Sequence, residues 1–223
     1  MRPTMFLVCI SCLIASGCER PKVAGTPAKI TNKPVKIVDE KGLKENLAEL
    51  DRVLKENAPF IHAKLAPPAT EAELSELRAG VGGVTLSSLE SWFQWHNGCT
   101  DRLTDLLPLG RMLSISESLQ DRKQIQKVPF VDSKRKNALK ILDDGSGDGF
   151  FIDVTSSAPR VFYYMLEDPY PTDYGTIPEF VQFIIKVHAA EIASLDSHGM
   201  VDFDPQKYDA LENAFIKTLE SRP

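Results

Sequence analysis

The sequence predicts an α+β fold in which helices precede and follow a central sheet of mainly antiparallel strands. Three observations support this class: helical periodicity over residues 41–97, short β-rich runs over 109–165, and renewed helical periodicity after residue 176. The strand runs follow one another and do not alternate with long helices. A doubly wound parallel sheet is therefore not expected.

The first helix is predicted over residues 41–57 by one apolar stripe. Its leucines are spaced by four, three and four residues, at Leu43, Leu47, Leu50 and Leu54. This spacing places them on one helical face. Pro59 is expected to help end the helix, because proline does not fit a helix interior.

Two further helices are predicted from start and stop signals. Thr70-Glu71-Ala72-Glu73 has the sequence of a capping box, Leu74 and Leu77 supply the buried face, and nearby glycines end the helix. Ser87-Ser88-Leu89-Glu90 repeats the capping pattern. The helix that it begins carries Leu89, Trp92, Phe93 and Trp95, most of which we expect to be buried, and closes at Asn97-Gly98.

Four short runs in the middle of the chain have the composition of strands. They are rich in β-branched or aromatic residues, are bounded by Gly, Asp, Ser or Pro, and cover 109–115, 138–142, 149–154 and 160–165. A polar helix at about 116–126 is expected between the first two. The loop 155–159 should join the last two as a hairpin.

Two helices are expected in the C-terminal part. Thr176-Ile177-Pro178-Glu179 has the pattern of a capped helix start, followed by an apolar face of Phe180, Phe183, Ile184 and Val187. Asp204-Pro205 begins a last helix that carries Tyr208, Leu211, Phe215 and Leu219.

The first residues have the form of an export signal that ends at a cysteine. A basic start is followed by roughly a dozen apolar residues, fewer than the ~20 that span a bilayer. Ala15-Ser16-Gly17-Cys18 then places small residues directly before a cysteine and resembles the bacterial lipobox. The prediction is a signal peptide over 1–17, lipidation of Cys18, a tether over 18–40 and one domain over 41–223, held on the membrane of the bacterial envelope.

Charge and cysteine usage narrow the functional classes. Of 26 basic and 31 acidic residues only Arg2 lies in the signal, which leaves the mature chain with a net charge of −6. Nucleic acid is not an expected partner, because phosphate binding needs a basic surface. After the signal and Cys18, only Cys99 remains, so no disulfide within the domain is expected. We expect a buried thiol at Cys99 in preference to a reactive one.

Several of these segments together resemble the SMI1/KNR4 (SUKH) family. The residues that carry the resemblance span about 43–187 and are strongest in Pro67-Pro68-Ala69-Thr70-Glu71 and Trp95-His96-Asn97-Gly98, followed by 143–153 and 175–180. The resemblance implies an α+β interaction domain without catalytic residues or cofactors. Bacterial members of the family are often immunity proteins that neutralise a toxin, and fungal relatives regulate cell-wall synthesis.

Two candidate sites have alternative interpretations. The acidic segment with Asp143, Asp144 and Asp148 is predicted to be a glycine-rich turn and an exposed contact region for a protein partner. A calcium loop is the alternative, but its twelfth position is Thr155 instead of Glu. His96 invites an acid-base role. We expect Trp95, His96, Asn97 and Gly98 to form a structural helix end in which His96 contacts free carbonyls, and no metal spacing is found among the other histidines.

The sequence therefore favours a membrane-anchored module that binds another protein. An immunity protein that neutralises a toxin is one example of such a module. An enzyme of the cell wall, or a carbohydrate-binding protein, is the alternative. A deep pocket with paired carboxylates would favour that alternative.

Overall fold

A computed structural model gives the arrangement of the helices and strands of the protein. The described residues are 40–82, 86–108, 110–128, 131, 133–156, 159–165 and 170–222. The predicted signal peptide, Cys18 and nearly all of the predicted tether lie outside them. Among the described residues, no helix is both long and apolar enough to cross a membrane.

The N-terminal helices agree with the prediction. α1 covers Glu40–Asn57, and its four stripe leucines are all buried. α2, Pro59–His62, is a single turn that begins at the proline expected to end α1. α3, Glu71–Gly80, starts with the predicted capping box between Thr70 and Glu73. α4 covers Ser87–Trp95.

The start of α4 differs from the prediction. Leu86 takes the N-cap position without a side-chain cap, so the expected capping box of Ser87 and Glu90 does not form. The Glu90 carboxylate instead accepts hydrogen bonds at 2.9 and 2.8 Å from the Arg78 guanidinium of α3. Glu90 thus pairs with a charged side chain of a neighbouring helix instead of with the backbone at the start of its own helix.

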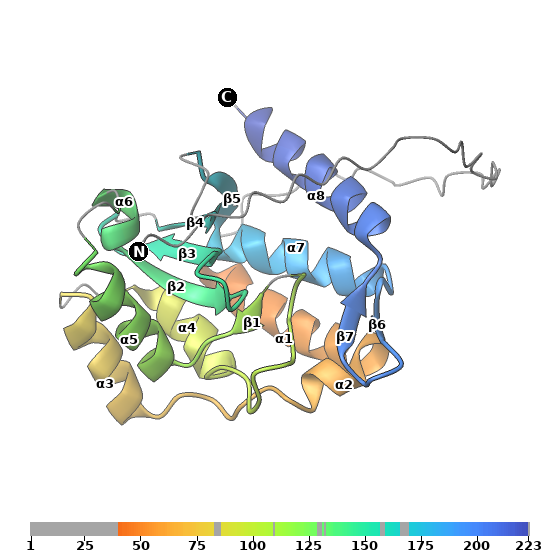
Figure 1. Ribbon diagram of the computed structural model, residues 1–223, viewed down its shortest axis with the longest axis horizontal. Helices are drawn as coiled ribbons and strands as arrows, with labels where there is room; N and C mark the ends of the chain where they lie inside the picture. Colours follow the sequence, from red (N-terminus) through yellow and green to blue (C-terminus); the bar gives the residue numbers. More distant parts are fainter. Residues whose placement is uncertain are drawn as a thin grey trace, which may run out of the picture. The chain divides into compact units, whose positions relative to one another are not determined.

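The central sheet has five antiparallel strands in the order β1-β2-β3-β4-β5 (Figure 1), which confirms the predicted α+β class. The strands are β1 Arg111–Met112, β2 Ala138–Asp143, β3 Gly149–Asp153, β4 Arg160–Tyr164 and β5 Thr172–Thr176. The first strand is much shorter than the predicted 109–115, because Ser114 already caps the next helix. α5, Ile115–Ile125, follows it directly, and the turn α6, Ser133–Lys136, precedes β2.

Helices cover both sides of the sheet, and side chains alternate between its faces. Leu139, Ile141, Phe150, Ile152 and Val161 belong to the main core with the leucines of α1 and the aromatic residues of α4. Ala138, Phe151 and Tyr164 form a second, smaller cluster. Trp92 and Phe93 are fully buried and Trp95 is half-buried, as expected for most of that aromatic group.

The C-terminal helices also begin where the sequence predicts. α7, Ile177–Ala189, packs along α1, and the Glu179 carboxylate accepts from the backbone N–H and the hydroxyl of Thr176. α8, Pro205–Glu220, is capped by Asp204. Between them a hairpin of β6, Ala193–Leu195, and β7, Val201–Phe203, was not predicted, and neither were β5, α2 and α6.

Candidate functional site

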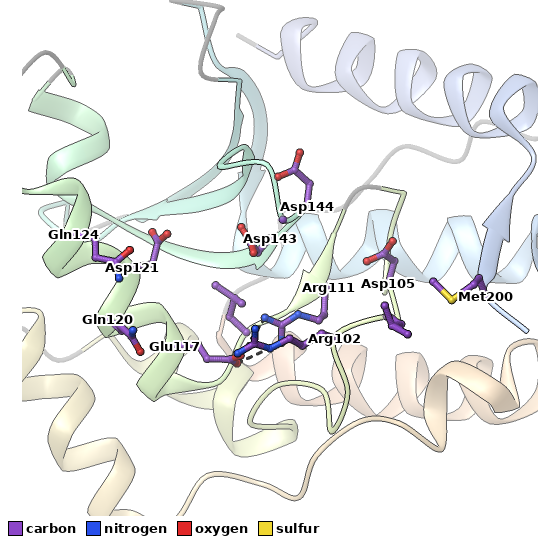
Figure 2. A pocket seen from close by; sticks show the side chains of 13 residues that line it. Arg102, Asp105, Arg111, Glu117, Gln120, Asp121, Gln124, Asp143, Asp144 and Met200 are labelled. Atoms are coloured by element: carbon purple, nitrogen blue, oxygen red, sulfur yellow. Dashed lines mark hydrogen bonds and ion pairs between the residues drawn. The ribbon is translucent and has the colours of Figure 1, made fainter. Parts of the chain in front are cut away.

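A polar groove of about 510 Å³ opens between α5, β1, the β2–β3 turn and the segment before β1 (Figure 2). Met200, from the β6–β7 turn, also reaches it. Its charged lining consists of five carboxylates and two guanidinium groups, belonging to Asp105, Glu117, Asp121, Asp143, Asp144, Arg102 and Arg111. The groove is therefore acidic.

α5 brings Glu117 and Asp121 to the groove because its first turn is held firmly. Ser114 caps the helix through a capping box with Glu117. Arg111 on β1 donates to the Glu117 carboxylate at 3.0 Å (Figure 2). Burial alone would raise the pKa of Glu117, but hydrogen bonds from Ser114 and Arg111 hold it below its ordinary value. Glu117 and Arg111 thus act as a fixed ion pair.

Lys140 compensates two further carboxylates from beneath the groove. Its side chain is 2% exposed, and its Nζ lies 2.8 Å from Asp143 Oδ1 and 3.3 Å from Asp121 Oδ1. The second oxygen of Asp121, Oδ2, is buried and has no hydrogen-bond partner among the described residues. Burial raises the pKa of Asp121 even though Lys140 opposes the shift. Lys140 therefore compensates the Asp121 carboxylate only in part, through its Oδ1 atom.

Asp105 is the carboxylate with the least compensation. Within the described residues it has no hydrogen bond or ion pair. Burial raises its pKa to about 6, the neighbouring charges of Asp144 and Asp143 add to the shift, and Arg111 opposes it. A cationic group placed in the groove would stabilise the ionised form of Asp105 and so lower its pKa.

The acidic turn predicted from the sequence connects β2 and β3. Asp143 and Asp144 line the groove, whereas Asp148 is not part of its lining. Asp144 accepts from the Ser146 backbone N–H at 2.8 Å and from its hydroxyl at 2.5 Å, which closes a local turn. All three residues are half-buried, so they are less exposed than the sequence predicts. The glycine-rich turn itself is as predicted.

Two apolar side chains that line the groove are exposed to solvent. Leu103 is 62% exposed and Met200 is 36% exposed, and both belong to the lining. Isolated exposed apolar residues are common. Here, however, two of them flank one charged hollow, which is the mixture found where proteins meet.

The predicted helix end, Trp95 to Gly98, lies away from the groove but supports it. The His96 Nδ1 atom lies 2.5 Å from the carbonyl of Ala66, which lies outside α4, so the expected contact with carbonyls of its own helix is replaced by a tertiary one. The Asn97 side chain accepts from the backbone N–H of Ile115 at 2.8 Å, at the start of α5. Gly98 has a φ of +92°, and an added Cβ would lie 2.6 Å from the Ser114 nitrogen.

The remaining candidate side chains do not add a reactive group. Cys99 is half-buried, and burial raises the pKa of its thiol to about 11, so it stays protonated at neutral pH. His188 is buried against the Leu106 carbonyl, and burial lowers its pKa to about 4. Cys99 is thus less buried than the sequence predicts, whereas the raised pKa agrees with the expected lack of reactivity.

Sequence reasoning found two of the groove carboxylates and missed three, together with Arg111 and Lys140. Asp105 and Asp121 belong to segments separated by up to 39 positions from Asp144 in the chain, and only the fold brings them together. Lys140 is a charged residue inside an otherwise apolar strand. It could have indicated acidic partners nearby, because a buried charge needs a partner.

Comparison of the chain with models of known protein families and with curated proteins gives no match. The resemblance to the SMI1/KNR4 family therefore stays a prediction from the residues that carry it.

Proposed function

We propose that this protein is a lipid-anchored binding module of the bacterial envelope whose acidic groove takes a basic segment of a protein partner. Lipidation at Cys18 would hold the domain at the membrane. The resemblance to the SMI1/KNR4 family supports binding as the activity, and neutralisation of a toxin is one form that such binding takes in that family.

A single observation carries the proposal: a groove with surplus negative charge is flanked by exposed apolar side chains. Five lining carboxylates face Arg102, Arg111 and the buried Lys140. Asp105 has no hydrogen bond or ion pair within the described residues, and burial raises its pKa even though Arg111 opposes the shift. An arginine or lysine of a partner would supply the missing donors, since a guanidinium can donate two hydrogen bonds to one carboxylate. Leu103 and Met200 would then pack against apolar atoms beside that charge.

The groove also gives some support to the alternative, an enzyme of the cell wall. The pKa values of two of its carboxyl groups are shifted in opposite directions: the pKa of Asp105 is raised to about 6, and that of Glu117 is lowered. Such pairs serve as acid and base in sugar hydrolases. None of the described lining residues is aromatic, however, so a stacking platform for a sugar ring is not provided by them. The exposed Leu103 and Met200 fit a protein contact better.

The proposal is tested by capture from envelope extract with the mature chain as bait. A chain carrying both Asp105→Asn and Asp144→Asn keeps the shape of the groove, including the Asx turn at Asp144, but removes two charges. The matched control carries Glu45→Gln and Glu76→Gln, which remove two exposed charges from α1 and α3. We expect one protein to be enriched by the wild type and the control, to be lost with the groove variant, and to elute as salt rises.

Enrichment of the same protein by the groove variant would contradict the assignment of the groove. A wild-type bait that captures nothing above a mock bait would remove the support for a binding role. Release of reducing sugars from purified cell wall, abolished by Asp105→Asn, would establish the enzymatic alternative.

A further inference from the structure

Three side chains that the sequence keeps apart converge where α1, α2 and the end of α4 meet. Asp51 lies on α1, His62 is the last residue of α2, and His96 directly follows α4. One nitrogen or oxygen atom of each lies within 4.8 Å of those of the other two. This cluster shares no residue with the acidic groove, so the inference drawn from it does not rest on the function proposed above.

Two distances within the cluster are close to those between ligands of one metal ion. Asp51 Oδ1 lies 2.9 Å from His62 Nε2 and 3.6 Å from His96 Nε2. Tetrahedral zinc with bonds of ~2.0–2.1 Å places its ligands ~3.3 Å apart. The two observed separations lie on either side of that value, so small side-chain rotations would bring both imidazoles and the carboxylate to one ion.

The ring of His96 is held in the orientation of a metal ligand. Its Nδ1 lies 2.5 Å from the Ala66 carbonyl oxygen, which can only accept, so Nδ1 carries the proton of that hydrogen bond. Ala66 is itself fixed, because its N–H donates to the Gly98 carbonyl at 2.8 Å. In the neutral ring the lone pair is then on Nε2, the atom that faces Asp51. A carbonyl on the second nitrogen is the usual support of a metal-binding histidine.

The two oxygens of the Asp51 carboxylate have different partners. Its Oδ2 accepts from Lys55 Nζ at 2.6 Å, on the same helix, while its Oδ1 faces the two imidazoles. Lys55 is 58% exposed, so it can move into water if an ion binds. The cluster therefore presents one oxygen and two nitrogens toward a common point.

The cluster is sheltered but open on one side. The side chains of Asp51, His62 and His96 are 27%, 24% and 16% exposed. Asp51 and His96 also line an open hollow of about 470 Å³, whose wall includes Trp95. Water from this side could complete a coordination sphere, as in sites with three protein ligands.

We propose that Asp51, His62 and His96 bind a divalent transition-metal ion, with zinc as the best fit. Two imidazoles with one carboxylate suit zinc and its late first-row neighbours, whereas calcium and magnesium prefer oxygen ligands alone. The bound ion would join α1 and α2 to the end of α4 through side chains, and its remaining position would face the hollow.

The test is zinc binding by the whole chain, purified from membranes in detergent and freed of metal with a chelator. Isothermal titration with zinc chloride gives affinity and stoichiometry, and thermal unfolding gives a second readout. We expect one zinc ion per chain and a higher Tm in its presence. His62→Gln, His96→Gln and Asp51→Asn should each weaken binding by more than ~100-fold, beyond the usual loss from an outer-shell change.

His198→Gln is the matched control, because it removes an exposed imidazole from the β6–β7 turn. It should bind zinc as the wild type does. Asp51 and His62 are partly exposed, so their two variants decide the matter even if His96→Gln does not fold. Binding that survives in both of those variants, or a wild type that binds no zinc, would overturn the proposal.

Discussion

Asp105→Asn is expected to stabilise the protein at neutral pH and to leave its stability nearly unchanged in acid. In the folded chain the pKa of Asp105 is raised from 3.8 to about 6, mainly by burial. The folded state therefore holds the proton of Asp105 more tightly than the unfolded state does. The resulting stabilisation is complete below the unfolded pKa and is lost as the pH rises through about 6.

The magnitude follows from the size of the shift. Two pKa units correspond to ~3 kcal/mol, and water at this partly exposed carboxylate reduces the expected effect to ~1–2 kcal/mol. Asparagine avoids that cost because it is neutral at every pH. The difference in unfolding free energy between the variant and the wild type should thus be near zero at about pH 3 and ~1–2 kcal/mol at about pH 7.5.

Urea unfolding at these two pH values measures the effect, with fluorescence of the buried Trp92 and half-buried Trp95 as the signal. Glu76→Gln on α3 is the control, since it removes an exposed carboxylate. An equal gain in the variant at both pH values would show that the effect is not electrostatic. A variant that is no more stable than the wild type at about pH 7.5 would refute the argument that Asp105 is strained by burial.

Three other changes have defined outcomes. Gly98→Ala should lower the unfolding free energy by ~2 kcal/mol or more in urea titrations, because its φ of +92° and a close backbone nitrogen oppose a side chain; an unchanged midpoint would contradict this. Lys140→Met should cost ~3–5 kcal/mol at neutral pH, since Asp121 and Asp143 lose their buried partner, and a smaller loss at low pH is expected. Cys18→Ser should abolish labelling by a fatty-acid probe, and persistent labelling would reject lipidation there.

Local signals in the sequence predicted much of the fold. The leucine stripe of α1 and the capping boxes at Thr70 and Thr176 depend on neighbours within a few positions, so they could be recognised directly. The box at Ser87 failed because a tertiary partner, Arg78, was available to Glu90. β5, Thr172–Thr176, was missed because its polar sequence gains strand structure only by pairing with β4.

The sites were less predictable than the fold, for a physical reason. Asp143 and Asp144 were proposed as contact residues from composition, and the fold places them in a groove. Asp105 and the cluster around His62 depend on distances between separate elements, which composition and spacing do not contain. His96 was assigned to a helix end on sequence grounds, and only the arrangement of α1 and α2 places a carboxylate and a second imidazole beside it.

The segment from His96 to Gly98 contacts both the cluster with Asp51 and His62 and the first turn of α5. His96 faces Asp51 and His62, while the next side chain, Asn97, holds the first N–H of α5, which carries Glu117 and Asp121 into the groove. Gly98 allows this segment to lie against the start of the same helix. An ion bound at His96 would therefore restrain the segment that positions α5. Binding effects are reciprocal. If zinc raises the affinity of the groove for its partner, the partner must therefore raise the affinity of the protein for zinc by the same factor.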